Sequence, residues 1–477
     1  MTKSIVRLVL LVVLTAAWVR DVDAQREPQV LTLAQAVNEA LVHNDRIVNQ
    51  RDSVEQAALG VRLARNNFRP KIIPNVQGSF GLTDVNNQIY RVDLTQRFTT
   101  GTEMRLGLGA STAQIPAAPF PGDVRFYNAD TTMSLNQPLL KGFGPSVARR
   151  GLTTADLRRA DAARQTRLME QQVTIDVASA YYRLVAQQTL VDVAEKSLER
   201  ARRLREASEA KMDAGLVSQL DVFRAQQLVT QAEIQLFDAQ GAVEDARDQL
   251  SFLLGRDPGS SFDVVPEIRK DVEPVVADDA VTMALEKRLD LQGAIADAAD
   301  AESAAAYARN QLLPQFDVNL ALTRRQTAPS LFSSFGFDGF QFVTFFTISM
   351  PVDRTPQAVD YQNALIDRDR RRREIDTIRK RIADDVKRAI RNRDRVLRTL
   401  AAAEVGVQIG EREVEVAQLR YERGLSNNLD VVSAETSLLN AESRRILALA
   451  ESAISRLSLR ATLGNLDPQR DLADQTP

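Results

Sequence analysis

The residue types that carry most protein chemistry are scarce in this chain of 477 residues, which has no cysteine and a single histidine, His43. Cysteine nucleophiles, disulfides and thiolate metal sites are therefore excluded. His43 lies among polar residues of a predicted short helix, where an ordinary surface or packing role is expected. Carboxylates or a serine–lysine pair remain as catalytic groups, and neither forms a motif. We expect no enzyme, no catalytic residue, no cofactor and no metal site.

The most distinctive carboxylates belong to a repeated motif. Gly215-Leu216-Val217-Ser218-Gln219-Leu220-Asp221-Val222 recurs 209 residues later as Gly424-Leu425-Ser426-Asn427-Asn428-Leu429-Asp430-Val431. An earlier block repeats with an offset of 244 residues, so that Ala64-Arg65-Asn66 matches Ala308-Arg309-Asn310. Two halves in the same order indicate a duplicated unit with internal pseudo-symmetry.

The positions of the prolines predict the helices that carry these motifs. Proline is absent between Pro145 and Pro258 and again between Pro356 and Pro468. Because proline breaks a helix interior at a cost of about 3 kcal/mol, both spans predict very long helices. Their apolar residues alternate spacings of four and three, as in a coiled-coil seam; the series begin Val173, Val177, Ala180, Leu184 and Ile382, Val386, Ala389.

Each proline-free span is interrupted once, at its copy of the glycine motif. The first span predicts a helix from about Ser146 to Met212, a chain reversal at Gly215, and a returning helix from about Ser218 to Leu254. The second span repeats this order around Gly424. The sequence therefore predicts an antiparallel helical hairpin, present twice.

Four segments between the helical blocks alternate apolar and polar residues: Asn75–Asp84, Arg125–Gln137, 316–323 and Gln341–Met350. Such segments are typical of transmembrane barrel strands, although a soluble antiparallel sheet with one wet face gives the same alternation. Seven phenylalanines between Leu331 and Phe346 favour the barrel, because aromatic residues gather at membrane interfaces.

Two further alternating segments, Tyr90–Phe98 and Glu103–Ser111, have no counterpart in the second half. They are either two more barrel strands or a hairpin above the membrane, and the pattern does not decide between these alternatives. In the first case four apolar side chains face lipid, namely Val92, Leu94, Leu106 and Leu108.

The N-terminus has the features of a secretory signal peptide. Lys3 and Arg7 precede an apolar run from Leu8 to Val19, and cleavage is expected after Ala24. No later stretch approaches 18 consecutive apolar residues. An exported chain of this kind can cross a membrane only as a barrel.

The charge balance gives no argument for nucleic acid, because the net charge is −2. Five of the six residues from Arg368 to Arg373 are arginines. We expect them to form a solvated helix start or an intersubunit belt of salt bridges, since an exported protein does not meet nucleic acid.

A secreted chain of two repeats, each with strands, a long helix, a glycine turn and a second long helix, resembles the TolC-like outer-membrane efflux proteins. The residues that carry the resemblance are the two glycine motifs and Gln137-Pro138-Leu139-Leu140-Lys141-Gly142-Phe143-Gly144, which is similar to the family's strand-to-helix junction. The resemblance extends from about Leu31 to Leu466.

The resemblance implies an α+β membrane protein whose duplicated strand–strand–helical hairpin unit forms a trimeric transmembrane β-barrel continued by an α-helical periplasmic barrel. It divides the chain into a signal peptide (1–24), a first repeat (25–257), a linker (258–275), a second repeat (276–466) and a C-terminal tail (467–477). A barrel with an aqueous lumen needs more strands than one such chain supplies.

The function implied is passive exit across the outer membrane for a tripartite efflux pump or a type I secretion system. The implied partners are two other copies of the chain in a homotrimer, outer-membrane lipid, a periplasmic adaptor protein and an inner-membrane transporter, and no nucleic acid. The alternative is a structural coiled-coil protein of the cell envelope, against which the amphipathic strands argue.

The family also suggests roles for individual residues. Gly215, Leu216, Gly424 and Leu425 correspond to the tips that dock the adaptor. Tyr421 and Asp221 match a tyrosine and an aspartate that bond to each other at the periplasmic gate, and Asp430 matches a carboxylate that lines the constriction. Ser426 and Ser433 stand where an arginine and a second carboxylate can occur in the family, so we expect a weaker lock and a single carboxylate ring. The aspartates could also serve at the starts of the returning helices.

Overall fold

The computed structural model describes residues 29–78, 86–116, 123–257, 259–260, 262–266, 268, 277–328, 330 and 339–467. The predicted signal peptide, much of the predicted linker and the tail beyond residue 467 lie outside these ranges. The described chain forms two compact units, one built from residues up to 49, 167–288 and 382 onward, the other from 50–166 and 289–381. Each unit is described by itself.

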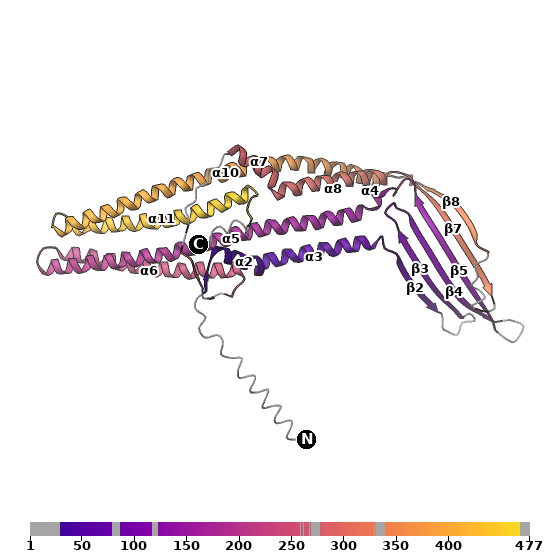
Figure 1. The fold of residues 1–477 in the computed structure, drawn as a ribbon, viewed down its shortest axis with the longest axis horizontal. Coiled ribbons are helices and arrows are strands. Elements are labelled where there is room, and N and C mark those ends of the chain that lie inside the picture. Colours follow the sequence, from indigo (N-terminus) through magenta and orange to yellow (C-terminus); the bar gives the residue numbers. More distant parts are fainter. Residues whose placement is uncertain are drawn as a thin grey trace, which may run out of the picture. The chain divides into compact units, whose positions relative to one another are not determined.

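Long helices dominate the chain, as the proline-free spans predict (Figure 1). Two helical hairpins are formed by α5 (Arg150–Asp213) with α6 (Gln219–Leu254) and by α10 (Thr355–Glu422) with α11 (Asn428–Thr462). The start of the predicted first helix differs, because a separate four-residue helix, α4 (Pro145–Ala148), precedes α5. The remaining helices are α2 (Leu33–His43), α3 (Asp45–Asn66), α7 (Ala277–Lys287) and α8 (Leu289–Gln311).

The heptad residues form the core of the first unit. Val173, Val177 and Leu184 on α5 are fully buried, as are Ile382 and Val386 on α10. A short parallel pair, β1 (Gln29–Leu31) with β6 (Phe262–Val264), lies against this core. Tyr181 donates to the carbonyl of Leu31 at 3.1 Å, and burial raises the pKa of Tyr181 to about 12. The hydroxyl therefore stays protonated and can keep donating at neutral pH.

The duplication is visible in the contacts of this unit. Gly255 ends α6 with a positive φ, and a Cβ there would lie 2.8 Å from the carbonyl oxygen of His43, the last residue of α2. Gly464 and Lys287 repeat this contact after α11 and at the end of α7. His43 itself is exposed.

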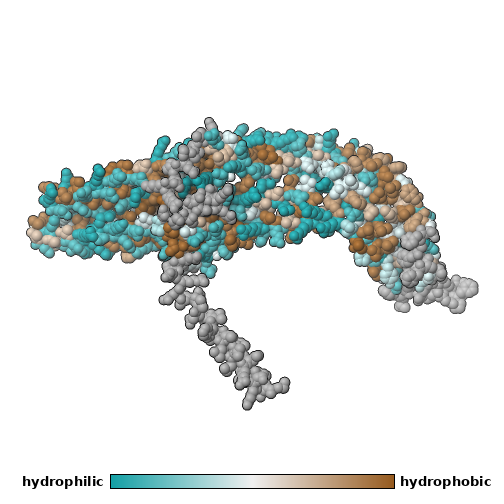
Figure 2. All heavy atoms as spheres, viewed as in Figure 1, coloured by the Kyte–Doolittle hydropathy of each residue, from teal (hydrophilic) through white to brown (hydrophobic). Residues whose placement is uncertain are grey.

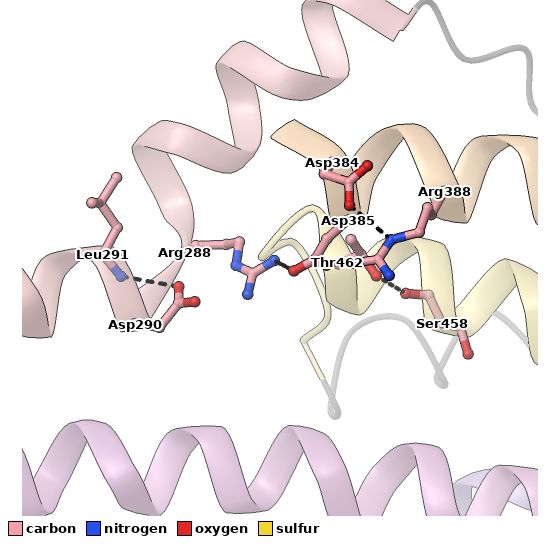
Figure 3. A network of polar contacts seen from close by, with 8 residues as sticks. All are labelled: Arg288, Asp290, Leu291, Asp384, Asp385, Arg388, Ser458 and Thr462. Atoms are coloured by element: carbon pink, nitrogen blue, oxygen red, sulfur yellow. Dashed lines mark hydrogen bonds and ion pairs between the residues drawn. The ribbon is translucent and has the colours of Figure 1, made fainter. Parts of the chain in front are cut away.

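An aspartate with an arginine partner is repeated as well, although Arg288 lies two residues before the equivalent of Arg46, which is Asp290. Arg46 contacts Asp176 on α5 at 2.8 Å, and in the second half Arg288 contacts Asp385 on α10 at 3.2 Å. Figure 3 shows the second pair, with Arg388 one turn along α10 contacting the same carboxylate. Asp176 and Asp385 are separated by the same 209 residues as the glycine motifs, so the two halves share one architecture.

The second unit contains a six-stranded antiparallel sheet in the order β2-β3-β4-β5-β7-β8. The strands are β2 (Lys71–Gly78), β3 (Asn86–Arg97), β4 (Glu103–Pro116), β5 (Asp123–Pro138), β7 (Gln315–Ala328) and β8 (Gln341–Ser349). The two extra alternating segments are β3 and β4, which pair with each other and insert between β2 and β5. They belong to the same sheet as the four segments predicted first. Residues 79–84 of the first predicted strand lie outside the described chain.

The sheet has one apolar and one polar face, as the alternation predicts. Direct cross-strand pairs place Val92 beside Leu108 and Leu94 beside Leu106 on the apolar face. That face is exposed, with Ile72, Val76 and Ile348 each 69–72% accessible, and apolar side chains gather over the sheet in Figure 2. Part of the predicted phenylalanine cluster, residues 331–338, lies outside the described chain.

On the polar face an ion pair spans β4, where the residues between the two charges are glycines. Arg91 on β3 lies 3.6 Å from Asp130 on β5, with β4 between them. The β4 residues beneath are Gly107 and Gly109, where a Cβ would lie within 2.8 Å of Arg91 and 2.2 Å of Asp130 respectively. The two glycines therefore make room for this ion pair.

The arginine run on α10 is paired locally. Arg372 lies 3.4 Å from Glu302 on α8, and Arg371 contacts Glu374 at 3.2 Å and Asp297 at 3.9 Å. Because α10 begins at Thr355, the run lies inside the helix and the expected helix start is wrong; the contacts show an ion-paired stretch of the helix interior. Among the described residues, no helix is both long enough and apolar enough to cross a membrane.

Candidate functional site

The two glycine motifs form equivalent tight turns at the tips of the hairpins. After α5, the amide of Leu216 donates to Lys211 and that of Gly215 to Met212, both at 2.8 Å. After α10, Leu425 and Gly424 make the corresponding bonds at 2.8 and 3.2 Å. This is the Schellman pattern, which closes a helix with a left-handed residue.

Backbone conformation explains the glycines of both turns. Gly215 has φ 72° and Gly424 has φ 70°, and open space surrounds both positions. The left-handed conformation therefore favours glycine, and crowding plays no part. The next residues, Leu216 and Leu425, are each 73% exposed. Each tip thus presents an apolar side chain to its surroundings.

Asp221 occupies the first turn of α6 and reaches back to the residue before the helix. Its carboxylate accepts from the amide of Ser218 at 3.2 Å and from the hydroxyl of Ser218 at 2.8 Å. Arg224 lies 3.6 Å from the same carboxylate. Asp221 therefore stabilises the start of α6, because it binds a backbone N–H that the helix leaves free.

Asp430 occupies the corresponding position in the first turn of α11, three residues after Asn427, which begins that helix. Its side chain is exposed. A carboxylate at this position is favoured by the helix dipole and is accessible to ions.

Tyr421 is buried between the two hairpins in a polar network. Its hydroxyl lies 2.9 Å from the hydroxyl of Ser208 on α5. Asn428 on α11, which is fully buried, donates to the same serine oxygen at 3.0 Å and to the backbone carbonyl of Asp221 at 2.8 Å. Within one chain, Tyr421 and the backbone of Asp221 are therefore linked through Ser208 and Asn428.

A lysine strengthens the same junction. Lys211, near the end of α5, donates to the backbone carbonyl of Tyr421 at 2.5 Å. Its ammonium group also lies 3.8 Å from the centre of the Tyr421 ring, a cation–π geometry. We name Tyr421, Ser208, Asn428 and Lys211 the tip lock, because they join α5 of one hairpin to α10 and α11 of the other.

Most of the described chain matches one protein family. The family described as “Outer membrane efflux protein” matches residues 36–256 and 280–465, the two repeats. The chain belongs to the outer membrane efflux protein family.

Solved structures of the family share the fold of this chain. The outer-membrane channel OprN is 18% identical, with a TM-score of 0.69 over 92% of this chain and 90% of that one. VceC from Vibrio cholerae is 16% identical, with a TM-score of 0.68 over 91% and 96% of the two chains. CusC is 14% identical, with a TM-score of 0.68 over 93% and 96%.

One curated relative is more similar in sequence over a shorter segment. The fusaric acid resistance protein FusA of Burkholderia cepacia is 31% identical over 135 residues, which is 28% of this chain and 25% of that protein. The match thus spans a quarter of the relative's length.

Sequence reasoning singled out Tyr421 and Asp221 but missed Ser208, Lys211 and Asn428. A signal for two of them exists in the duplication, because the lock residues differ between the halves: Tyr421 corresponds to Met212, Asn428 to Gln219, and Ser208 to Ala417. Comparing the copies for polar differences at buried helix positions would have found this network.

Proposed function

We propose that this chain forms the outer-membrane exit channel of a tripartite efflux pump or a type I secretion system. Membership of the efflux family supports the export role. The two-faced sheet supports membrane insertion, because an exposed apolar face on a sheet is stable against lipid. The channel passes substrates without chemistry on them, and the helical part extends into the periplasm.

The proposed assembly is a homotrimer. Among the described strands, β2 and β8 are the edges of the sheet, and unpaired edges are costly in a membrane. Pairing β8 of one copy with β2 of the next closes them. Because β3 and β4 belong to the sheet, three copies supply eighteen strands, a number that leaves an aqueous channel.

The proposed partners meet the channel at the hairpin tips. Gly215 and Gly424 shape the turns, and Leu216 and Leu425 supply apolar contacts to a periplasmic adaptor, which connects the channel to an inner-membrane transporter. Their exposure in the isolated chain supports this role, since exposed apolar groups at a rim mark protein contacts.

The proposed gate is the periplasmic end of the helical tunnel. Tyr421 and Asp221 hold the two hairpins together through the tip lock, and Asp430 places one carboxylate per chain near the axis. Three like charges in a narrow passage favour bound cations and suppress anions.

Conduction by the purified protein tests the proposal. Native mass spectrometry in detergent should give a trimer, and planar bilayers should show cation-selective channels. A monomer that keeps its full β-sheet circular dichroism and conducts no ions would overturn the channel assignment and favour a structural coiled-coil protein of the envelope.

A further inference from the structure

Two helices of the first unit carry apolar stripes that remain open in the single chain. The exposed residues are spaced by four, seven and three residues on α10 and by three and eleven residues on α6, which places them on one face of each helix. Each is 45–61% exposed. The stripe on α6 contains Leu220, Phe223 and Ile234, and the stripe on α10 contains Val405, Ile409, Val416 and Leu419.

The other two helices meet in a closed seam within the chain. Arg200 on α5 contacts Glu435 on α11 at 2.7 Å and Glu442 at 3.7 Å. Val193 and Ile446, further along the same helices, are buried in one core. Since α5 runs toward its tip and α11 away from its own, the helices are antiparallel, and Arg200 stands opposite the middle of the segment 435–442.

The duplication predicts a second seam equivalent to this one, whose two faces are exposed in the single chain. Moving each residue by 209 positions converts α5 into α10 and α11 into α6. The buried Val193 becomes Ala402, which is exposed, and the buried Ile446 becomes Phe237, which is 68% exposed. Both faces of the second seam therefore exist, and both are open in the single chain.

The repeat also predicts how the open faces align. Arg200 corresponds to Ile409, and the segment 435–442 corresponds to 226–233, whose middle lies between Val229, which is buried, and Thr230, which we take as the partner of Ile409. Antiparallel steps from this pair bring three apolar pairs into register: Val405 opposite Ile234, Val416 opposite Phe223, and Leu419 opposite Leu220. The ion pair leaves Val229 and Thr230 as the two possible partners of Ile409, and the apolar pairing of the stripes, together with the burial of Val229, favours Thr230.

We propose that α10 of one chain packs against α6 of a second copy through these stripes, in this register. The contact joins two different faces of the chain, and such a head-to-tail contact generates a ring when the rotation closes. The inference rests on the homotrimer of the proposed function and identifies its helical interface. Within each chain the seam is ionic at its centre, whereas between chains Ile409 takes the place of Arg200, and Gln226 and Glu233 take the places of Glu435 and Glu442.

Disulfide cross-linking of the full-length trimer tests the register. The chain has no cysteine of its own, so Phe223→Cys with Val416→Cys introduces one designed pair. The control combines Thr230→Cys with Val416→Cys, which is one heptad out of register, or about 10 Å along the helix. That displacement exceeds the Cα separation of about 4.4–6.8 Å that a disulfide spans.

Mild oxidation of the designed pair should replace the monomer band with covalently linked trimers on a denaturing gel, while the control and each single-cysteine variant stay monomeric. Ile234→Cys with Val405→Cys provides a second pair if the first variant does not assemble. A trimer, verified by native mass, that fails to cross-link at either designed pair overturns the interface but leaves the channel assignment intact. Equal cross-linking of the control overturns the register, and the absence of any trimer overturns both proposals.

Discussion

At the residue scale, the proposed gate depends on the neutral hydrogen bond between Tyr421 and Ser208. Tyr421→Phe removes the contact with Ser208 and leaves the ring under Lys211. A net buried hydrogen bond contributes about 1 kcal/mol, which is roughly a fivefold change in the closed-to-open ratio. We expect more frequent openings in single-channel recordings. Ser208→Ala removes this bond and also the one that Asn428 donates to the same oxygen, so it should give an equal or larger change. Adding Tyr421→Phe to Ser208→Ala should change little further, because the bond between the two residues is already lost.

An additive double variant would show that Tyr421 and Ser208 act separately, and unchanged conductance in all three folded trimers would remove the gate role. Tyr361→Phe, on α10 within the second unit, is the matched control, since it makes the same chemical change away from the tips.

Asp430 supports a prediction about selectivity. Asp430→Ala removes three carboxylates from the trimer and should lower the permeability ratio of potassium to chloride. The exposed charge is screened by salt, with a Debye length of about 10 Å at 0.1 M and about 3 Å at 1 M. The difference between variant and parent should therefore shrink as salt rises. Reversal potentials in asymmetric potassium chloride measure both effects, and an unchanged ratio at low salt would place Asp430 outside the constriction.

At the element scale, each glycine motif contains two separable roles: the glycine shapes the turn, and the leucine after it is proposed to contact the adaptor. Leu216→Ser with Leu425→Ser keeps both glycines and removes the exposed apolar groups. We expect export to fall while trimer stability is unchanged, because both side chains are already in solvent. Drug susceptibility of cells, measured at equal amounts of membrane-inserted trimer, reports the effect. Normal export would argue against docking at the leucines.

Gly215→Ala with Gly424→Ala is the complementary pair. A side chain at these positive φ values costs about 1–2 kcal/mol per residue, so this pair should lower the thermal stability of the hairpins while the leucines stay in place. Loss of export from this pair with normal stability would contradict a purely conformational role for the glycines.

The elements were largely predictable, because long helices and alternating strands leave periodic patterns in the sequence. The helix from Ser146 begins instead as two pieces, since Arg149 between them leaves the helical pattern, a detail that apolar spacing does not encode. Ser208 and Asn428 were missed for another reason: they lie 220 residues apart, and only packing of the two hairpins brings them together. Gly107 and Gly109 likewise gain their meaning from Arg91 and Asp130 on neighbouring strands.

At the scale of the whole molecule, the duplication explains which helix faces are packed within one chain and which remain exposed. Each hairpin has two lateral faces. One face of each is covered within the chain at the α5–α11 seam, and the others are the stripes on α6 and α10. The edges β2 and β8 repeat this situation in the sheet. A chain with two unlike open edges in each layer is suited to closing a ring with its own copies.

The β-hairpin formed by β3 and β4 determines the number of strands in the proposed barrel and therefore its width in the membrane. If β3 and β4 join the barrel, Leu94 and Leu106, which pair directly, face lipid. Leu94→Cys and Leu106→Cys in reconstituted trimers should then react with an apolar maleimide that partitions into the bilayer and resist a charged, membrane-impermeant one. Thr95→Cys and Arg105→Cys, a direct pair on the opposite face, are the matched controls and should show the reverse through the aqueous lumen. Equal reaction of all four positions with the charged reagent would place the hairpin above the membrane and reduce the barrel to twelve strands.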